Sequence, residues 1–310
     1  MFRNLLVPFI PPAKSNPTVD STDWRDEWSI GIYSGESPFN LAPMATVTNP
    51  VLTWKHVSDV SAAFVADPFM IRVGQKWHMF FEVMNRESRK GEIGLATSED
   101  GANWTYQQIV LAEPYHLSYP YVFEWMNDYY MIPESYMAGS VRLYKASAFP
   151  TRWSFAGALF AGPFFADPSV LRYDNKWWLF VDASPEMQHN TLRLFWTQDL
   201  TGIWKEHPLS PIVAGNPHIA RPAGRMLVVE NKPVRYTQDC CPTYGTQVRA
   251  FEITELTTRS YLEREIAENP VLTAGAAGWN EAGMHHVDPH LRDDGRWVAC
   301  VDGFCWKEIK

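Results

Sequence analysis

Residues 66–82, ADPFMIRVGQKWHMFFE, contain an Asp-Pro pair, two apolar runs separated by a Gly-Gln turn, and a closing acid. The pattern recurs in residues 166–182, ADPSVLRYDNKWWLFVD, and in residues 287–302, VDPHLRDDGRWVACVD. From the Asp to the closing acid the offsets are 15, 15 and 14 residues. Two further segments, Tyr119 to Glu134 and Arg221 to Arg235, keep the spacing with other residue types. Five copies of one strand–turn–strand unit predict an all-β fold, a five-bladed β-propeller.

The second half of each unit also repeats, and it indicates how the ring closes. Short strands are expected at residues 93–96, 141–144, 192–195 and 248–251. The unit at Asp288 runs out of chain after two strands, whereas residues 30–33, IGIY, match residues 93–96, IGLA. We therefore expect residues from about 28 to 56 to complete the last blade and to cover its edges. The predicted organisation is an extended arm, residues 1–23, and a single propeller domain, residues 24–310.

Composition and charge exclude several classes of protein. The chain has 310 residues, 46% of them hydrophobic, which is ample for a large core. Its net charge of −8 argues against a nucleic-acid partner, and no apolar run approaches the ~20 residues of a membrane span. The four cysteines lack a CxxC spacing, so we expect neither a metal site nor a disulfide framework. The first twelve residues are a poor secretion signal, which favours a cytoplasmic location. The oligomeric state is left open.

In a propeller the innermost strands line a central channel, and their first residues face its mouth. The repeat therefore places five residues around one cavity: Asp67, Tyr119, Asp167, Arg221 and Asp288. Converging carboxylates repel one another, so at least one should have a raised pKa, which suits a general acid. Arg221 would hold another carboxylate ionised. An Asp before Pro also commonly caps a turn, and that alternative stays open for each Asp.

The opening Ala-Asp-Pro and the segment GLATSEDGANW, residues 94–104, resemble the five-bladed propeller glycosidases of families 43, 32 and 68. The segments HLSYPYVF (116–123), MIPES (131–135) and RYTQD (235–239) further resemble an uncharacterised propeller family. Its plant members form the N-terminal part of an inositolphosphorylceramide glucosaminyltransferase. The resemblance covers about residues 24–305, and it implies a carbohydrate or glycoconjugate ligand and no cofactor.

The resemblance also implies roles for individual residues. Asp67 matches the general base of family 43 or the nucleophile of family 32, and Asp167 matches the Asp that orients sugar hydroxyls. The family-43 acid is a Glu on a later blade, where this chain offers Arg221. Glu134 is the best substitute as proton donor, with Glu82 and Glu281 behind it.

Several other residues are candidates for binding the ligand, each with a structural alternative. His116 and Tyr119 would stack on a sugar near the mouth. Arg235, Gln238 and Asp239 would bind a hydroxyl or an anionic group, or would only pin a loop. Asp288 and His286 lie in GMHHVDPH, residues 283–290, which suits a substrate contact or a structural hydrogen-bond cluster equally.

Two functions are therefore expected. The first is an enzyme that cleaves or transfers a glycosidic bond, with Asp67, Glu134 and Asp167 as catalytic groups and Tyr119, His116, Arg221, Arg235, Gln238, Asp288 and His286 around the ligand. The second is a non-catalytic glycan-binding module that works beside a glycosyltransferase. The missing fourth-blade acid favours the second.

Overall fold

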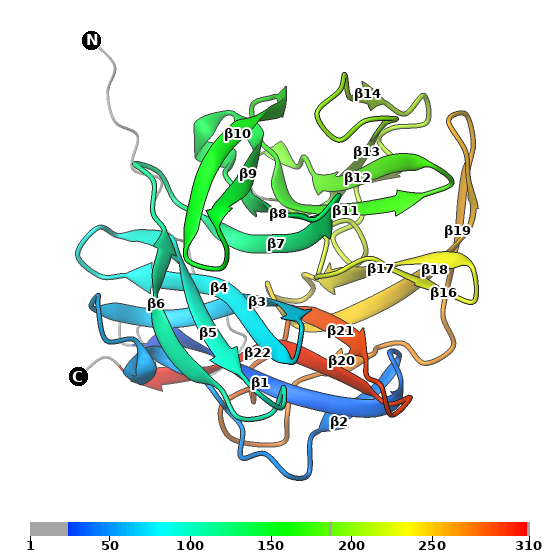
Figure 1. Cartoon of the computed structure of the whole chain (residues 1–310). Coiled ribbons are helices and arrows are strands. Elements are labelled where there is room, and N and C mark those ends of the chain that lie inside the picture. The colour runs from blue at the N-terminus through cyan, green and yellow to red at the C-terminus, as the bar shows by residue number, and fades with distance from the viewer. Residues whose placement is uncertain (1–23, 186–187, 309–310) are drawn as a thin grey trace.

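Five antiparallel sheets surround a central axis in the computed structural model, which describes residues 24–185 and 188–308 (Figure 1). The predicted five-bladed β-propeller is confirmed. Apart from two short 3-10 helices, η1 (Trp54–His56) and η2 (Tyr136–Ala138), the regular structure of these residues is β-strand. The arm predicted for residues 1–23 lies outside the described residues.

Each blade is a four-stranded sheet that runs from an inner strand to an outer one, with one extra short strand in blades three and four. Blade one comprises β3 (Ala62–Val73), β4 (Lys76–Asn85), β5 (Lys90–Ser98) and β6 (Thr105–Leu111). Blade two comprises β7 (Ser118–Trp125), β8 (Asp128–Glu134), β9 (Ser140–Ala148) and β10 (Arg152–Ala161). Blade three comprises β11 (Ala166–Tyr173), β12 (Lys176–Asp182), β13 (Thr191–Thr197), β14 (Lys205–Glu206) and β15 (Val213–Ala214). Blade four comprises β16 (Leu227–Val229), β17 (Lys232–Asp239), β18 (Gln247–Leu256), β19 (Tyr261–Glu265) and β20 (Leu272–Thr273).

Blade five joins the two ends of the chain, as the repeat predicted. It comprises β21 (Val287–Leu291), β22 (Trp297–Glu308), β1 (Trp24–Ser37) and β2 (Asn40–Pro43). β1 pairs with β22 without interruption from Trp24 opposite Glu308 to Gly35 opposite Trp297. This pairing covers an edge of each long strand and closes the ring inside blade five.

Aromatic side chains fill the spaces between blades. The Phe80 and Trp153 rings meet at 5.4 Å between blades one and two, and the Phe123 and Trp177 rings meet at 5.5 Å between blades two and three. Such edge-to-face and tilted contacts contribute roughly 0.5–1.5 kcal/mol beyond the burial of their surface. The high aromatic content of the chain is therefore explained largely by packing between sheets.

Blade four departs from the predicted repeat. Its inner strand begins at Leu227 rather than at Arg221, because Gly224 interrupts the chain with φ of 129° and a parallel bridge to Val287. A Cβ at Gly224 would lie 1.8 Å from the Val287 carbonyl oxygen, so only glycine allows this approach. Residues 221–223 still pair with β17, through a Pro222–Thr237 bridge and the Gln238 N–H bonded to the Arg221 carbonyl at 2.8 Å. The interruption therefore sets Gln238, and not Arg235, opposite Arg221.

We predict that deleting residues 1–45 prevents folding, because β22 then loses the strand that covers its apolar edge. The variant should aggregate and show no cooperative thermal transition by circular dichroism. Deletion of residues 1–23 is the control, because it leaves β1 and β2 complete. A soluble 46–310 chain that melts cooperatively would contradict the role given to β1.

Candidate functional site

Asp67, Tyr119 and Asp167 occupy the same unusual backbone position on blades one, two and three. Each lies in a β-bulge: in blade one, Ala66 pairs with Glu82 and Phe69 pairs with Phe80, so two residues face one. Their φ angles are 52°, 47° and 51°, a left-handed conformation that is rare for non-glycine residues. The bulge adds one residue to the inner strand, which explains the offset of 15 in these three units.

Asp288 does not lie in a bulge, and its offset of 14 is the 13 that separates Phe69 from Glu82 plus one residue from a longer hairpin turn. It pairs with Cys300 in an unbroken register, as Phe69 pairs with Phe80. Asp288 is therefore equivalent to Phe69 rather than to Asp67. Its carboxylate contacts Arg225 Nε at 2.5 Å, His290 Nε2 at 3.1 Å and the Met70 N–H at 2.6 Å. These contacts form a group separate from the acids of blades one to three.

The closing acids share a second slot, at the end of the second strand of each blade. Glu82, Asp182, Gln238 and Asp302 stand opposite the apolar residues Ile93, Leu192, Val248 and Ile30, respectively. Glu134 ends β8 in the same way, opposite Ser118. In blade four this slot belongs to Gln238 and not to Arg235.

Arg221 anchors the acidic group. Its Nε and Nη2 donate to the two oxygens of Asp167 at 2.6 and 3.3 Å, and Nη2 lies 3.6 Å from Glu134 Oε2. Gln238 Nε2 donates to Asp167 Oδ2 at 2.8 Å. Arg221 Nη1 donates to His189 Nδ1 at 2.8 Å, which makes that ring nitrogen an acceptor and the imidazole neutral. The structure thus brings together Asp167 and Arg221, two of the five residues that the repeat placed around one cavity, and it adds the candidates Glu134 and Gln238 to them.

The charges in this group separate the pKa values of Glu134 and Asp167. Burial raises the pKa of Glu134 well above its usual range, and the nearby Asp167 carboxylate raises it further. Burial opposes ionisation of Asp167 too, but the Arg221 guanidinium and a hydrogen bond from Glu134 hold its pKa below the usual value. The pKa of Glu134 therefore lies above that of Asp167, so a shared proton favours Glu134 and the charge favours Asp167. Such a pair provides an acid beside an ionised carboxylate.

Asp67 lies between this group and blade five. Its N–H donates to Asp302 Oδ2 at 2.9 Å, and its Oδ1 lies 3.8 Å from both His285 Nε2 and His286 Nδ1. Burial raises the pKa of Asp67 to about 7, against the effect of charged His285 and with the help of the Asp167 carboxylate. The contact with Asp302, 2.7 Å from Nδ1, raises the pKa of His285 despite burial. Burial lowers the pKa of His286 to about 4, so this ring is neutral.

Three carboxyl oxygens of this group have no hydrogen-bond partner although they are buried: Asp67 Oδ1, Glu82 Oε1 and Glu134 Oε2. Buried polar atoms almost always find a partner, so three unpaired ones in one group require an explanation. Hydroxyl groups of a ligand, or water in its place, would satisfy them. The partly exposed rings of His116 and His189, with side-chain exposures of 22% and 15%, mark the side that opens to solvent.

The structure corrects two predicted ligand contacts. Tyr119 is fully buried, and its hydroxyl bonds to Ser169 Oγ at 2.8 Å and to the Gly224 backbone, so it braces three blades and does not stack on a ligand. Arg235 is also buried and forms two 2.6 Å bonds with Glu263 on β19, away from the acids. The reserve acid Glu281 is exposed and accepts from the Gly278 N–H.

His116 lies beside Glu82, where it adds to the acidic group. Its Nδ1 accepts from the Gly91 N–H at 2.9 Å, and its Nε2 lies 3.5 Å from Glu82 Oε1. Burial lowers the pKa of His116 to about 4, so the neutral ring presents an Nε2–H to Glu82. His286, by contrast, is fully buried against the Phe69 ring at 4.5 Å, and neither of its nitrogens has a hydrogen-bond partner.

Comparison with known proteins gives the family. Residues 21–304 match the family model described as glucosamine inositolphosphorylceramide transferase 1, N-terminal. The chain is 35% identical over 305 residues to glucosamine inositolphosphorylceramide transferase 1 of Oryza sativa subsp. japonica, a match that spans 91% of this chain and 40% of the relative. The corresponding protein of Arabidopsis thaliana is 32% identical over 301 residues, which span 91% of this chain and 39% of the relative. The chain belongs to this family.

The family bears on two expectations. The chain spans about 40% of the length of these curated relatives. The predicted cytoplasmic location is wrong. The relatives are named as glucosamine inositolphosphorylceramide transferases, and inositolphosphorylceramide is a ceramide lipid. Membership of this family overturns the expectation, which was based on a weak secretion signal. Within residues 24–185 and 188–308, no helix has the length and apolar character needed to cross a membrane.

Solved structures support the fold. A thermostable family-43 glycoside hydrolase superposes with a TM-score of 0.57 at 14% identity, over 85% of this chain and 96% of that one. This likeness confirms the glycosidase-like propeller that the repeat and the sequence resemblance predicted. At this identity it carries no information on the reaction.

The expected catalytic and ligand-binding residues did not include four residues that lie in or beside the acidic group. The repeat could have indicated two of them, and no sequence pattern indicated the other two. Asp302 and Glu82 close repeat units, so the repeat indicated their positions. The sequence did not predict that Asp302 contacts Asp67 or that Glu82 contacts His116. His189 and Tyr244 contact Arg221 from irregular loops, with Tyr244 5.2 Å below the guanidinium. No periodicity relates such loops, so the sequence carried no signal for these two.

We predict that Glu82→Gln stabilises the protein more at pH 8 than at pH 4. Burial raises the pKa of Glu82 well above its usual range, so the folded state keeps a proton that the unfolded chain loses above about pH 4.3. Stability conferred by the wild-type side chain therefore falls as pH rises from that point through the folded pKa. Denaturant unfolding should show the variant about 1–2 kcal/mol more stable at pH 8.

The control for this measurement is Glu268→Gln, an exposed acid that should shift stability by less than about 0.5 kcal/mol at either pH. An equal effect of Glu82→Gln at pH 4 and pH 8 would show that Glu82 is ionised in the folded protein.

Proposed function

We propose that the chain acts on a glycosidic bond of a glycoconjugate, held over the acidic group where the inner strands begin. The observation that carries the proposal is one buried cluster in which Arg221 contacts Asp167 and Glu134, with the pKa raised at Glu134, lowered at Asp167 and about 7 at Asp67. Glycosidases require such a division between an acid and a base or nucleophile. Membership of a glycolipid transferase family and a glycosidase-like fold agree with a glycan ligand.

Glu134 serves as proton donor in this proposal. Its single proton bonds to Asp167 in the free protein, and in this proposal it turns to the glycosidic oxygen when a ligand binds beside the unpaired Oε2. As the carbon–oxygen bond to the leaving group cleaves, Glu134 gives its proton to that oxygen and becomes a carboxylate. The Arg221 guanidinium, 3.6 Å away, then stabilises the new charge.

Asp67 acts on the anomeric carbon, either directly or by taking a proton from water. Its Oδ1 is buried and unpaired, and the bulge fixes its carboxylate at the end of the channel. Asp167 is a positioning residue for ligand hydroxyls, because Arg221 and Gln238 together hold its two oxygens in place. Removal of either neighbour would release Asp167.

A second function, a glycan-binding module without catalysis, is favoured by one observation. Blade four contributes Arg221 and Gln238 to the group, where family-43 enzymes place their acid, and both are engaged with Asp167. In that case Asp67, Glu82 and Glu134 would bind sugar hydroxyls as acceptors and donors, and no bond would break.

We predict that Asp67→Asn and Glu134→Gln each reduce turnover by about 10²–10⁴-fold, because each removes one positioned acid or base. Glu134→Gln should slow aryl glycosides with poor leaving groups more than those with activated ones. The assay is turnover of aryl furanosides, aryl pyranosides and uronides, with calorimetric binding of the same sugars. Arg296→Gln, an exposed change far from the acids, is the matched control. Sugar binding without wild-type turnover on the whole panel would establish the binding module instead.

We further predict that kcat/KM on an activated aryl glycoside rises through an apparent pKa near 7. Asp67 must be ionised to act, and burial raises its pKa to about 7, so activity increases as pH passes that value. The interacting carboxyls titrate as a group, so the value belongs to the cluster. A pH profile flat between pH 5 and 8 would exclude Asp67 as the base or nucleophile.

A further inference from the structure

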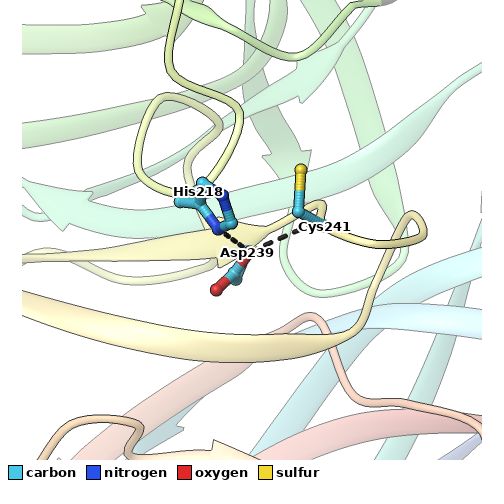
Figure 2. Close-up of side chains that lie close together, drawn as sticks. All are labelled: His218, Asp239 and Cys241. Atoms are coloured by element: carbon cyan, nitrogen blue, oxygen red, sulfur yellow. Dashed lines mark hydrogen bonds and ion pairs between the residues drawn. The ribbon is translucent and has the colours of Figure 1, made fainter.

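Blade four carries a second group of chemically active side chains, separate from the acids. His218, Asp239 and Cys241 lie together at the end of β17, and one donor atom from each lies within 4.8 Å of the others (Figure 2). His218 Nδ1 is 2.8 Å from Asp239 Oδ1, and the Cys241 N–H donates to the same oxygen at 3.1 Å. Nitrogen, oxygen and sulfur donors in one place are a ligand set for a transition metal.

Local structure explains why these residues meet. Asp239 is the last residue of β17, and Cys241 follows two residues later in the loop to β18. His218 comes from the loop between β15 and β16, which is tied to the first loop by the Cys240 N–H bonded to the Pro217 carbonyl at 3.0 Å. Two segments of different sequence position therefore present their side chains to one point.

Hydrogen bonds from β18 hold one carboxylate oxygen of Asp239, and the other oxygen faces His218. Asp239 Oδ2 accepts from Gln247 Nε2 at 2.9 Å and from Arg249 Nε at 3.1 Å, and Arg249 also pairs with Glu265. Oδ1 faces His218 and the Cys241 N–H. Metal ligands are commonly oriented by outer hydrogen bonds of this kind. The His218 side chain is 52% exposed, so an ion from solvent has access.

We propose that His218, Asp239 and Cys241 bind a divalent transition metal of the zinc type, with water as fourth ligand. Metal–donor distances of about 2.0–2.3 Å place two ligands of one ion about 3.3–3.6 Å apart. His218 Nδ1 and Asp239 Oδ1, now 2.8 Å apart, must therefore separate by roughly 0.5 Å, and Cys241 Sγ, within 4.8 Å of both, must approach by up to about 1.5 Å. Rotation of the half-exposed His218 side chain and of the partly buried Cys241 side chain supplies these shifts. The Cys241 thiol loses its proton to solvent on binding, and the thiolate and carboxylate together balance the ion's two charges.

The position of this site gives it a consequence for the acidic group. His218 is three residues from Arg221, and Asp239 directly follows Gln238. The Arg221 and Gln238 side chains both donate hydrogen bonds to Asp167. A metal that joins the two segments would fix the spacing between Arg221 and Gln238. The site would then act as a positioning device for Asp167, whether the acids catalyse a reaction or only bind a sugar.

The test is direct binding of metal to the chelator-treated full chain. We expect calorimetry to show one Zn²⁺ per chain, and Co²⁺ to give a thiolate charge-transfer band. Cys241→Ser should abolish that band, and His218→Ala should weaken Zn²⁺ binding at least about tenfold. The adjacent Cys240→Ser is the matched control and should leave both signals unchanged. Thermal melting identifies any variant that fails to fold. His218→Ala should fold, because the His218 side chain is half-exposed.

Three outcomes would overturn the proposal: no Zn²⁺ binding by the wild type, wild-type affinity in both Cys241→Ser and His218→Ala, or loss of the cobalt band in Cys240→Ser alone. Asp67→Asn separates this site from the other buried His–Asp group, formed by Asp67, His285 and Asp302. Metal binding that is lost in Asp67→Asn and kept in His218→Ala would place the ion there and not on blade four.

Discussion

The ion pair between Arg221 and Asp167 is the interaction on which the acidic group depends. It joins blades three and four, and it places a guanidinium 3.6 Å from Glu134 of blade two. Without that cation, Asp167 would be one more buried carboxyl among Asp67, Glu82 and Glu134, and burial would drive all of them to the protonated form. Removing one partner of a buried pair typically costs about 3–5 kcal/mol. Burial raises the pKa values of Asp67, Glu82 and Glu134, and the contact with Arg221 is the largest of the effects that lower the pKa of Asp167.

A second polar layer lies beside the acidic group. Arg225 pairs with Asp288 and also donates to the Met70 and Val122 carbonyls at 3.2 and 3.0 Å, so it joins blades one, two, four and five. Tyr119 joins blade two to Ser169 and Gly224. Asp288 and Tyr119 are buried, and the Arg225 side chain is 14% exposed. This layer of hydrogen bonds joins the inner strands beside the acids.

Sequence periodicity predicted the fold and about half of the acidic group, and the reasons for the difference are physical. The spacing of Asp67 and Asp167 was informative because a bulge with a fixed geometry produced it. The offset of 14 at Asp288 was misleading, because the bulge is missing there and a longer hairpin turn restores most of the spacing. In blade four the same offset arose by coincidence, since Gly224 displaces the strand and moves Gln238 into the slot assigned to Arg235. The pKa separation depends on three-dimensional distances between blades, which no repeat encodes.

The pairing of β1 with β22 also determines when this protein can finish folding during its synthesis. Trp24 lies opposite Glu308, so the last blade requires residues from both ends of the chain. Blades one to four can form as they leave the ribosome, but blade five must wait until residue 308 has emerged. For most of translation β1 has no partner, and it is a candidate for wrong pairings and for chaperone binding. Contacts of such high sequence separation also make the closing step slow.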